Sequence, residues 1–348
     1  MSARIGLVGA GWWATFNHIP TIQKSDAADI VAICDLDEAR LAEVGDTFSI
    51  ANRHTDLAAM LAEENLDGVI VSTPHVAHRD PAIMALQAGC HVLVEKPMAT
   101  TAQDGWAIAN AAQKADRQVL VPTGMNFEWF SMKAAQWVRD GRIGDVRHAA
   151  CQMGSALSDL FAGEPMMETT DHMYRPPAST WADPKRAGGY GWGQLSHALA
   201  WLFYVSDLRA QSAYCMVGRS PTGVDFYDAA TARATNGATI ALSGASTVPK
   251  HVGMHIDIKI YGTEGMIAFN NANAHLALYR DDKADEVVSM SAEDGEYDGM
   301  LPVEVFAKLC AGETVENASG GENGARVTEL LHALYRSAET DSLITIGG

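Results

Sequence analysis

Short apolar runs alternate with longer amphipathic segments through the first 122 residues. The apolar runs are rich in β-branched side chains and lack strict alternation, which is typical of strands buried on both faces. The segments between them are long enough to be helical crossovers between parallel strands. The expected strands are 5–8, 30–34, 69–72, 91–94 and 119–121, and the expected helices are 37–47, 56–64, 80–88 and 101–114. This order predicts an α/β domain of the Rossmann type, with a doubly wound parallel sheet, over residues 1–122.

The pattern changes after Pro122. Residues 212–288 alternate between apolar and polar positions and carry turn signals at Asn236-Gly237 and Gly262-Thr263, which predicts a mostly antiparallel sheet. The other expected elements are helices at 130–140, 191–204, 302–310 and 322–338, strands at 146–153 and 343–346, and a long polar loop ending near residue 186. We therefore expect residues 123–348 to form a second α/β domain with a large open sheet. Its uncovered face predicts a homodimer or homotetramer.

Composition narrows the class of protein. The chain has 348 residues, and 25 Lys and Arg against 43 Asp and Glu give a net charge of −18. Such a field repels phosphate backbones and anionic lipids, so we expect neither nucleic acid nor a membrane as partner. The five cysteines are scattered without a C-x-x-C spacing, so we expect neither a disulfide framework nor a metal site. The N-terminus lacks the apolar stretch of a secretory signal, and a cytoplasmic location is expected.

A glycine-rich turn follows the first expected strand. Gly9, Gly11 and Ala14 fit the pattern G-x-G-x-x-G/A, with Trp12 and Trp13 between the last two positions. Such a turn lets the backbone approach a pyrophosphate at a helix N-terminus. Asp35 ends the next strand, where a carboxylate accepts a hydrogen bond from a ribose 2′-OH and repels a 2′-phosphate. The motif favours NAD over NADP, although a turn glycine pair beside a solvated Asp would leave the same pattern.

Polar motifs end the next two expected strands. One is Thr73-Pro74-His75, with His78 close behind, and the other is Glu95-Lys96-Pro97. The carboxyl ends of parallel strands are where ligands bind in such sheets, so both motifs are candidate cofactor contacts. Desolvation near a nicotinamide would lower the pKa of Lys96 and let it exchange a proton, with Glu95 positioning it. The alternative is that these polar residues only lead the chain out of the core, and that Pro97 ends the strand.

Together these motifs resemble the glucose-fructose oxidoreductase / inositol dehydrogenase / rhizopine catabolism (Gfo/Idh/MocA) family. The resemblance extends to Gly124-Met125-Asn126 and to Ala187-Gly188-Gly189 ahead of His197, and so covers essentially the whole chain. It implies NAD(P)-dependent oxidation or reduction of sugars, polyols or their derivatives. It also implies that Lys96 contacts the nicotinamide and the reacting hydroxyl, and that Asn126 lines the nicotinamide side of the cleft.

The second domain departs from the family pattern around His197. Relatives typically carry an Asp four residues before this histidine, where this chain has Gly193. Gln194 is the nearest polar alternative, and it cannot stabilise an imidazolium by charge; a carboxylate from residues 159–183 is another. Glu128 also stands where many relatives carry an arginine. Tyr174 and Trp192 are candidate sugar contacts, with core packing as their alternative role.

The interpretation is an NAD-dependent dehydrogenase that oxidises a secondary hydroxyl of a sugar, polyol or glycoside. Lys96 and His197 would take up the hydroxyl proton. Two alternatives remain open at this point: a glycosidase that uses NAD for transient oxidation and elimination, and a non-catalytic cofactor-binding sensor.

Overall fold

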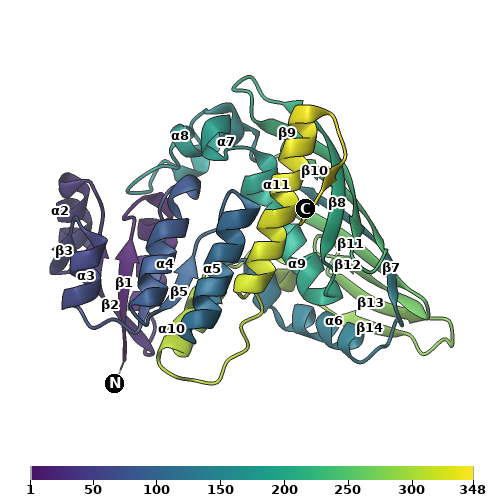
Figure 1. Cartoon of the computed structure of the whole chain (residues 1–348), viewed down its shortest axis with the longest axis horizontal. Coiled ribbons are helices and arrows are strands. Elements are labelled where there is room, and N and C mark those ends of the chain that lie inside the picture. The colour runs from purple at the N-terminus through teal and green to yellow at the C-terminus, as the bar shows by residue number, and fades with distance from the viewer. Residues whose placement is uncertain (1, 348) are drawn as a thin grey trace. The chain divides into compact units, whose positions relative to one another are not determined.

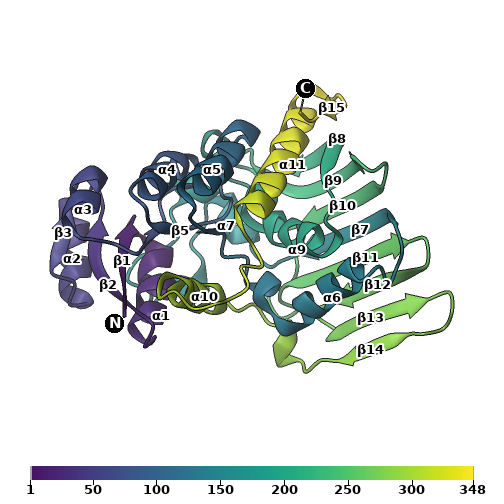
Figure 2. The same cartoon turned by 60° about the horizontal axis from the view of Figure 1, so that its bottom comes forward.

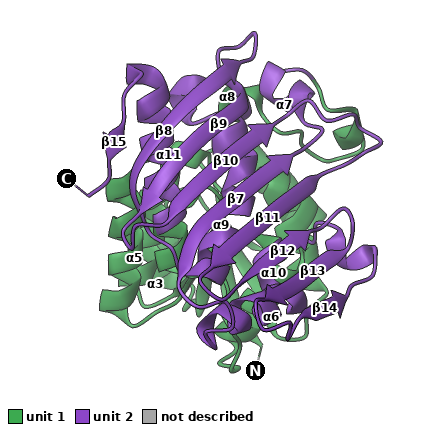
Figure 3. Cartoon of the chain, turned by 90° about the vertical axis from the view of Figure 1, so that its right-hand side faces the viewer, with its two compact units in different colours: residues 1–124, 165–180, 299–325 green, residues 125–164, 181–298, 326–348 purple. Residues whose placement is uncertain are grey.

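The computed structural model describes residues 2–347, which form two compact units (Figure 3). Of the described residues, unit 1 comprises 2–124, 165–180 and 299–325, and unit 2 comprises 125–164, 181–298 and 326–347. Both units are α/β, and each is built around one sheet (Figure 1). The expected fold class is therefore confirmed.

The sheet of unit 1 has six parallel strands in the order β3-β2-β1-β4-β5-β6. Their bounds are β1 Ala3–Val8, β2 Ala28–Cys34, β3 Asn52–His54, β4 Gly68–Val71, β5 His91–Val94 and β6 Val119–Leu120. Val8 pairs with Val71, and Val71 pairs with Val94, so β1, β4 and β5 end at one level. The residues that follow these strands consequently share one edge of the sheet, as the doubly wound pattern predicts.

Three crossover helices of unit 1 begin where a side chain caps their free N–H groups. Asp37, Asp56 and Thr101 cap α2 (Glu38–Thr47), α3 (Leu57–Glu63) and α5 (Ala102–Ala115), and α4 spans Arg79–Gln87. Buried side chains from α3, α4 and α5 form one apolar cluster with those of β1, β4 and β5. Two further helices, α1 (Ile19–Gln23) and α10 (Leu301–Cys310), pack on the sheet as well (Figure 2).

Two parts of this architecture differ from the expectation. The short edge strand β3 is polar (Asn52-Arg53-His54), so it lacks the apolar signal that marks a buried strand. The polar segment before residue 186 contains four short helical turns and is not a bare loop. These turns are α7 (Ser158–Ala162), η4 (Met167–Thr169), α8 (Ala178–Trp181) and η5 (Pro184–Arg186).

The sheet of unit 2 has nine strands in the order β14-β13-β12-β11-β7-β10-β9-β8-β15. All neighbours are antiparallel except β7 and β10. The bounds are β7 Val146–Gly154, β8 Ala210–Arg219, β9 Asp225–Ala234, β10 Thr239–Ala245, β11 His255–Gly262, β12 Gly265–Asn270, β13 His275–Arg280, β14 Glu286–Ser289 and β15 Ile344–Thr345. The mostly antiparallel open sheet is thus as predicted.

Helices cover one face of this sheet, and the other face is turned toward the viewer in Figure 3. Helices α6 (Trp129–Arg139) and α9 (Ser196–Ser206) pack on the covered face, where Trp201 stacks on Phe269 at 4.6 Å. Helix α11 (Gly321–Thr340) is the last helix of the chain. None of the helices in the described part of the chain combines the length and the apolar character that a membrane span requires.

Candidate active site

The glycine turn after β1 leaves room for a dinucleotide phosphate. Gly9 has φ +91°, and a Cβ there would lie 2.6 Å from the carbonyl oxygen of Ser72, so no side chain is tolerated. A Cβ on Gly11, by contrast, would have no heavy atom within 4 Å. The turn therefore joins a tight contact with β4 to an open approach at the start of a helix, which fits the phosphate of a bound NAD.

Asp35 is held against this turn. Its Oδ2 accepts a hydrogen bond from the Ala10 N–H at 2.9 Å, and its Oδ1 accepts one from the Asp37 N–H at 3.0 Å. Arg40 lies 3.4 Å from Oδ2 and also lies over the ring of Tyr174, 5.5 Å from its centroid. The carboxylate is thus fixed beside the glycines, where a ribose hydroxyl would find an acceptor.

Glu95 and Lys96 directly follow β5, at the same edge of the sheet. The Glu95 N–H donates to the Val71 carbonyl at 3.0 Å, and its buried carboxylate accepts a hydrogen bond from the Lys96 N–H at 3.0 Å. Burial lowers the pKa of the Lys96 ammonium to about 8, although the Glu95 charge opposes the shift. The amine can therefore be neutral or charged close to physiological pH, as a proton-transfer group requires.

Sequence reasoning missed His18, which is the closest neighbour of Glu95. His18 ends the π-helical turn η1 (Ala14–His18), is 0% exposed, and places its Nε2 3.0 Å from Oε1 of Glu95. Burial alone would raise the pKa of Glu95, but His18, Lys96 and His78 outweigh it and hold that pKa below its usual value. The only sequence signal was a histidine on the helix that follows the glycine turn.

His78 ties the two strand-end motifs together. Its Nδ1 lies 2.8 Å from the Pro97 carbonyl oxygen, and its Nε2 lies 2.8 Å from that of Thr73. Burial lowers the pKa of His78, and the two carbonyl contacts oppose this shift. The Thr73 hydroxyl donates to the Ala77 carbonyl at 3.0 Å, Pro74 precedes the turn η2 (His75–Ala77), and His75 is buried. All of these predicted cofactor residues lie at the same edge of the sheet.

The two tryptophans of the glycine turn join an aromatic cluster. Trp12 Nε1 donates to Nδ1 of His172 at 2.8 Å, and the rings of Phe16 and His172 stack at 3.9 Å. Trp13 meets Trp12 edge-on at 5.3 Å. Tyr174 lies in the same segment and donates to Glu43 at 2.7 Å, so its hydroxyl is engaged by α2 and its ring by Arg40.

In unit 2, packing explains why the expected acid before His197 is missing. Gly193 lies in the π-helical turn η6 (Gly191–Leu195), directly before α9. A Cβ at this position would lie 3.0 Å from ring atoms of both Phe161 and Trp181. An aspartate here would therefore require these aromatic rings to move.

His197 lies on the first turn of α9 and is 7% exposed. The ring of Tyr297 meets it edge-on, with centroids 5.3 Å apart. Gln194 is partly exposed and is the polar side chain of η6. Trp192 is buried and stacks on Tyr335 at 5.0 Å, so in unit 2 it has the packing role that the sequence left open.

Two carboxylates that the sequence offered as substitutes have other partners. Lys250 pairs with Asp159 at 2.8 Å, and Asp183 accepts a hydrogen bond from the Lys185 N–H at the start of η5.

The Asn126 side chain is buried and donates to the Ala200 carbonyl at 3.1 Å, which fastens it to α9. Its proposed contact with nicotinamide stays a prediction. Burial, together with the charges of Asp298 and Asp294, raises the pKa of Glu128 to about 7.

A buried carboxyl pair anchors the turn η6. Asp225 accepts hydrogen bonds from the Gly191 N–H at 2.7 Å and from the Tyr335 hydroxyl at 2.7 Å. The Tyr335 hydroxyl in turn accepts from the Trp192 N–H at 3.2 Å. Burial and the charge of Asp225 raise the pKa of the neighbouring Asp228 well above its usual value. The pair thus retains a proton while it holds the backbone that leads to Gln194 and His197.

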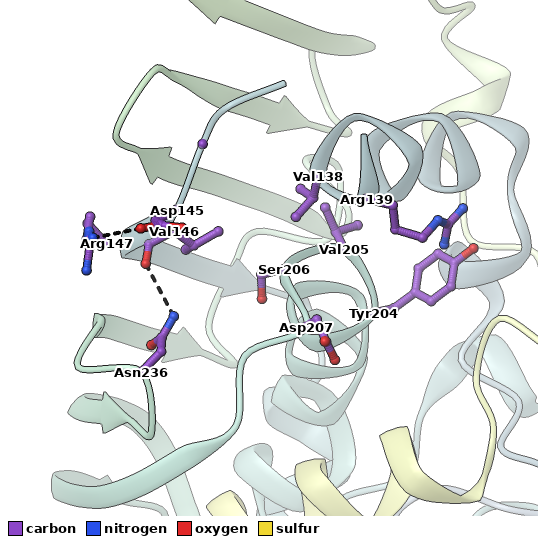
Figure 4. A pocket seen from close by; sticks show the side chains of 11 residues that line it. Val138, Arg139, Asp145, Val146, Arg147, Tyr204, Val205, Ser206, Asp207 and Asn236 are labelled. Carbon is purple, nitrogen blue, oxygen red and sulfur yellow. Dashed lines mark hydrogen bonds and ion pairs between the residues drawn. The ribbon is translucent and has the colours of Figure 1, made fainter. Parts of the chain in front are cut away.

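A pocket of about 760 Å³ lies at the other end of α9 (Figure 4). Arg139, Tyr204 and Asp207 are among its lining residues, and Arg147 pairs with Asp145 at 2.9 Å at its side. Tyr204 follows His197 by seven residues, which places the two Cα atoms about 10 Å apart along a helix. The pocket contains none of the predicted site residues, so it is not the candidate active site.

Two family models match this chain. The model of an oxidoreductase family with an NAD-binding Rossmann fold matches residues 3–123, and the model of the GFO/IDH/MocA C-terminal domain matches residues 131–268. The chain belongs to the GFO/IDH/MocA oxidoreductase family. Within this family, residues 3–123 form its NAD-binding domain, in agreement with the glycine turn and Asp35.

Two of the similar relatives are dehydrogenases, and others are glycosyl hydrolase family 109 proteins of Shewanella baltica, 28% identical over 42% of this chain and 33% of the relative. A D-apiose dehydrogenase of Paraburkholderia graminis is 34% identical over 161 residues, which are 46% of this chain and 42% of the relative. A 1-carboxy-3-chloro-3,4-dihydroxycyclohexa-1,5-diene dehydrogenase of Comamonas testosteroni is 31% identical over 69% of this chain and 54% of the relative. The matches thus span about half the length of these two dehydrogenases.

A solved relative covers the whole fold. The WlbA dehydrogenase of Bordetella pertussis, crystallised with NADH and UDP-GlcNAcA, has a TM-score of 0.73 and 25% identity, with 99% of each chain covered. The GFO/IDH/MocA architecture therefore extends through both units of the present chain.

The buried carboxyl pair predicts how stability depends on pH. The pKa of Asp228 is raised in the folded state. The free energy of unfolding therefore falls as pH rises above 3.8, which is the ordinary pKa of an aspartate. Asp228→Asn keeps the size and shape of the side chain, and the amide stays uncharged at both pH values. We expect it to raise Tm at pH 8 by about 2–4 °C more than at pH 5, as measured by differential scanning calorimetry. An equal shift of Tm at both pH values would show that Asp228 does not titrate in this way.

Proposed function

We propose that this protein is an NAD-dependent dehydrogenase that oxidises a secondary hydroxyl of a sugar, polyol or glycoside. The observation that carries the proposal is Lys96, an amine with a pKa of about 8 beside a buried carboxylate, at the same sheet edge as the glycine turn and Asp35. The names of the relatives, among them a D-apiose dehydrogenase, support a hydroxylated substrate.

The residues of unit 1 would bind the cofactor and move a proton. When NAD is bound, its nicotinamide provides the acceptor for a hydride. Gly9 and Gly11 would hold the pyrophosphate, and Asp35 the ribose. The neutral amine of Lys96 would accept the hydroxyl proton, and its ammonium would return the proton in the reverse reaction. Oxidation is therefore expected to rise as pH increases through about 8, the pKa of Lys96.

The residues of unit 2 would bind the substrate. His197 has the hydrogen-bonding groups to bind a hydroxyl and share its proton, and Gln194 is a partly exposed amide one turn before it. No side chain at position 193 supplies a charge to His197, so Lys96 would be the main proton acceptor. We assign His197 and Gln194 to orientation of the substrate as well as to proton sharing.

Asp35 supports NAD as the preferred cofactor. A 2′-phosphate would meet the carboxylate that Ala10 and Asp37 hold in place, and two negative groups at that distance repel each other. Arg40 is engaged by Asp35 and Asp37. This pairing reduces its availability for a phosphate.

We also propose that the open face of the unit 2 sheet pairs with a second copy of the chain. Met216 and Tyr227 are 60% and 46% exposed on adjacent strands, and Val287 is 62% exposed near the far edge. Exposed apolar side chains on a sheet are typical of an interface. The uncovered sheet face supports a homodimer or homotetramer.

The role of Lys96 predicts a separation of binding from turnover. We expect Lys96→Ala to lower kcat by about 10²–10⁴-fold because the proton acceptor is lost, while NAD still binds. Lys96→Arg is the matched variant, since it keeps the charge but cannot deprotonate. The measurements are NADH formation with a panel of sugars, inositols, sugar acids and glycosides, and NAD binding by calorimetry. Turnover within threefold of wild type in both variants would reject the role. Release of an aglycone without net NADH would instead indicate the glycosidase chemistry.

The role of Asp35 predicts a change in cofactor preference. We expect Asp35→Ser to raise KM for NAD by about 10–100-fold, because a hydrogen bond to a charged group is lost, and to improve activity with NADP. Asp37→Ala removes the cap of α2 but not the ribose acceptor, so its KM for NAD is expected to match wild type. The measurement is steady-state kinetics of each variant with NAD and with NADP. An unchanged ratio of NAD to NADP activity in Asp35→Ser would contradict the assignment.

The sheet interface predicts a change in molecular mass. We expect wild-type protein to be a dimer or tetramer by light scattering, and Met216→Glu with Tyr227→Glu to shift it toward monomer because charges would be buried. A monomeric wild type at micromolar concentration would overturn this proposal.

A further inference from the structure

The buried neighbour of Glu95 has no role in the chemistry described so far. We propose that His18 is a positioning residue that holds Glu95 as a carboxylate beside Lys96 and thereby sets the proton affinity of the Lys96 amine. The inference rests on the proposed function of Lys96. It adds the residue that tunes this amine.

Contacts around Glu95 support this role. Its carboxylate has the Lys96 N–H on Oε2 and the His18 Nε2 on Oε1, each at 3.0 Å. The Glu95 side chain is nearly buried, so water cannot replace a lost partner. Removal of the imidazole would leave a buried carboxylate with one backbone donor.

His18 cannot pass a proton onward to solvent. It is 0% exposed, and neither of its ring nitrogens has a partner with hydrogen-bond geometry among the described residues 2–347. Its Nε2 lies 3.0 Å from Oε1 of Glu95 as an ion-pair contact. The geometry therefore favours a fixed electrostatic role for the imidazole instead of a relay.

The backbone around His18 is held by local contacts. The π-helical turn η1 adds a residue to the helix after the glycines, and such turns are frequent at functional sites. The Thr15 hydroxyl donates to the Gly11 and Trp12 carbonyls, each at 3.1 Å. Asn17 Nδ2 donates to the Gly299 carbonyl at 2.8 Å. The imidazole is thus fixed relative to the cofactor turn.

Three titratable groups face Glu95 from separate elements: His18 from η1, Lys96 from the end of β5, and His78 from the start of α4. His18 makes the largest contribution to holding the pKa of Glu95 down, ahead of Lys96 and His78. Loss of His18 would raise the pKa of Glu95. A neutral Glu95 would stop supporting the Lys96 ammonium, whose pKa would then fall further.

The test compares His18→Leu with His18→Gln in the full chain. We expect His18→Leu to lower the plateau kcat for oxidation about 10–100-fold and to move the Lys96 limb of the pH–rate profile to lower pH. His18→Gln can place an amide N–H near Glu95, and it should return the limb most of the way to the wild-type position. His54→Leu is the matched control. His54 lies 3.0 Å from Glu64 in a second His–Glu pair of unit 1, and its loss should leave the limb in place.

A second readout needs no turnover. Competitive acetylation of the intact protein across pH, followed by mass spectrometry of the peptide that contains Lys96, reports the proton affinity of the amine. A midpoint lower in His18→Leu than in wild type and His18→Gln supports the proposal. An identical midpoint in all three variants overturns it, even if Lys96→Ala has abolished turnover. Full turnover in Lys96→Ala would instead remove the proposed function and leave the acetylation result to stand alone.

Discussion

The register of three parallel strands determines where the chemistry can occur. Val8, Val71 and Val94 end β1, β4 and β5 at one level, so the glycine turn, Thr73 and Glu95-Lys96 emerge side by side. A shift of one residue would turn the buried side chains of a strand to its other face. Two ladder bonds secure the level: Ser72 N–H to Val8 carbonyl and Glu95 N–H to Val71 carbonyl. The cofactor turn and the amine therefore depend on the apolar packing beneath them.

Burial gives the site its chemical character. Lys96 is an ordinary lysine except that its surroundings lower the pKa to about 8 and its nearest charge is a carboxylate with fixed partners. In unit 2, a buried carboxyl pair holds the backbone before His197 through Gly191 and Tyr335. Both units thus use buried acids with assigned donors to hold a neighbouring functional residue. His197 follows Gly193 by four residues, and a side chain at position 193 would meet the rings of Phe161 and Trp181.

Local periodicity predicted much of this architecture because helices and buried strands leave a signal within a few residues. The five apolar strands of the first domain, the helices between them, and the alternation in residues 212–288 all belong to this kind. The sequence pattern did not predict the strand β3 because its residues are polar. The roles of His18, Tyr297 and Tyr335 were not predicted for another reason. Their contacts join residues 77, 100 and 143 positions apart in the chain, and no local pattern reports such pairs.

Motifs give more specific predictions for the cofactor residues than for the substrate residues. The glycines, Asp35 and Lys96 need particular backbone positions next to strand ends, so sequence order alone places them. Substrate residues depend on which side chains are already engaged, and Trp192, Asp159 and Tyr174 have partners in their own units. The most direct test is a crystal structure with NAD and an unreactive substrate analogue. The account predicts Lys96 Nζ about 3 Å from the analogue's hydroxyl and beside the nicotinamide. A nicotinamide bound away from Lys96, with the amine turned from the hydroxyl, would contradict it.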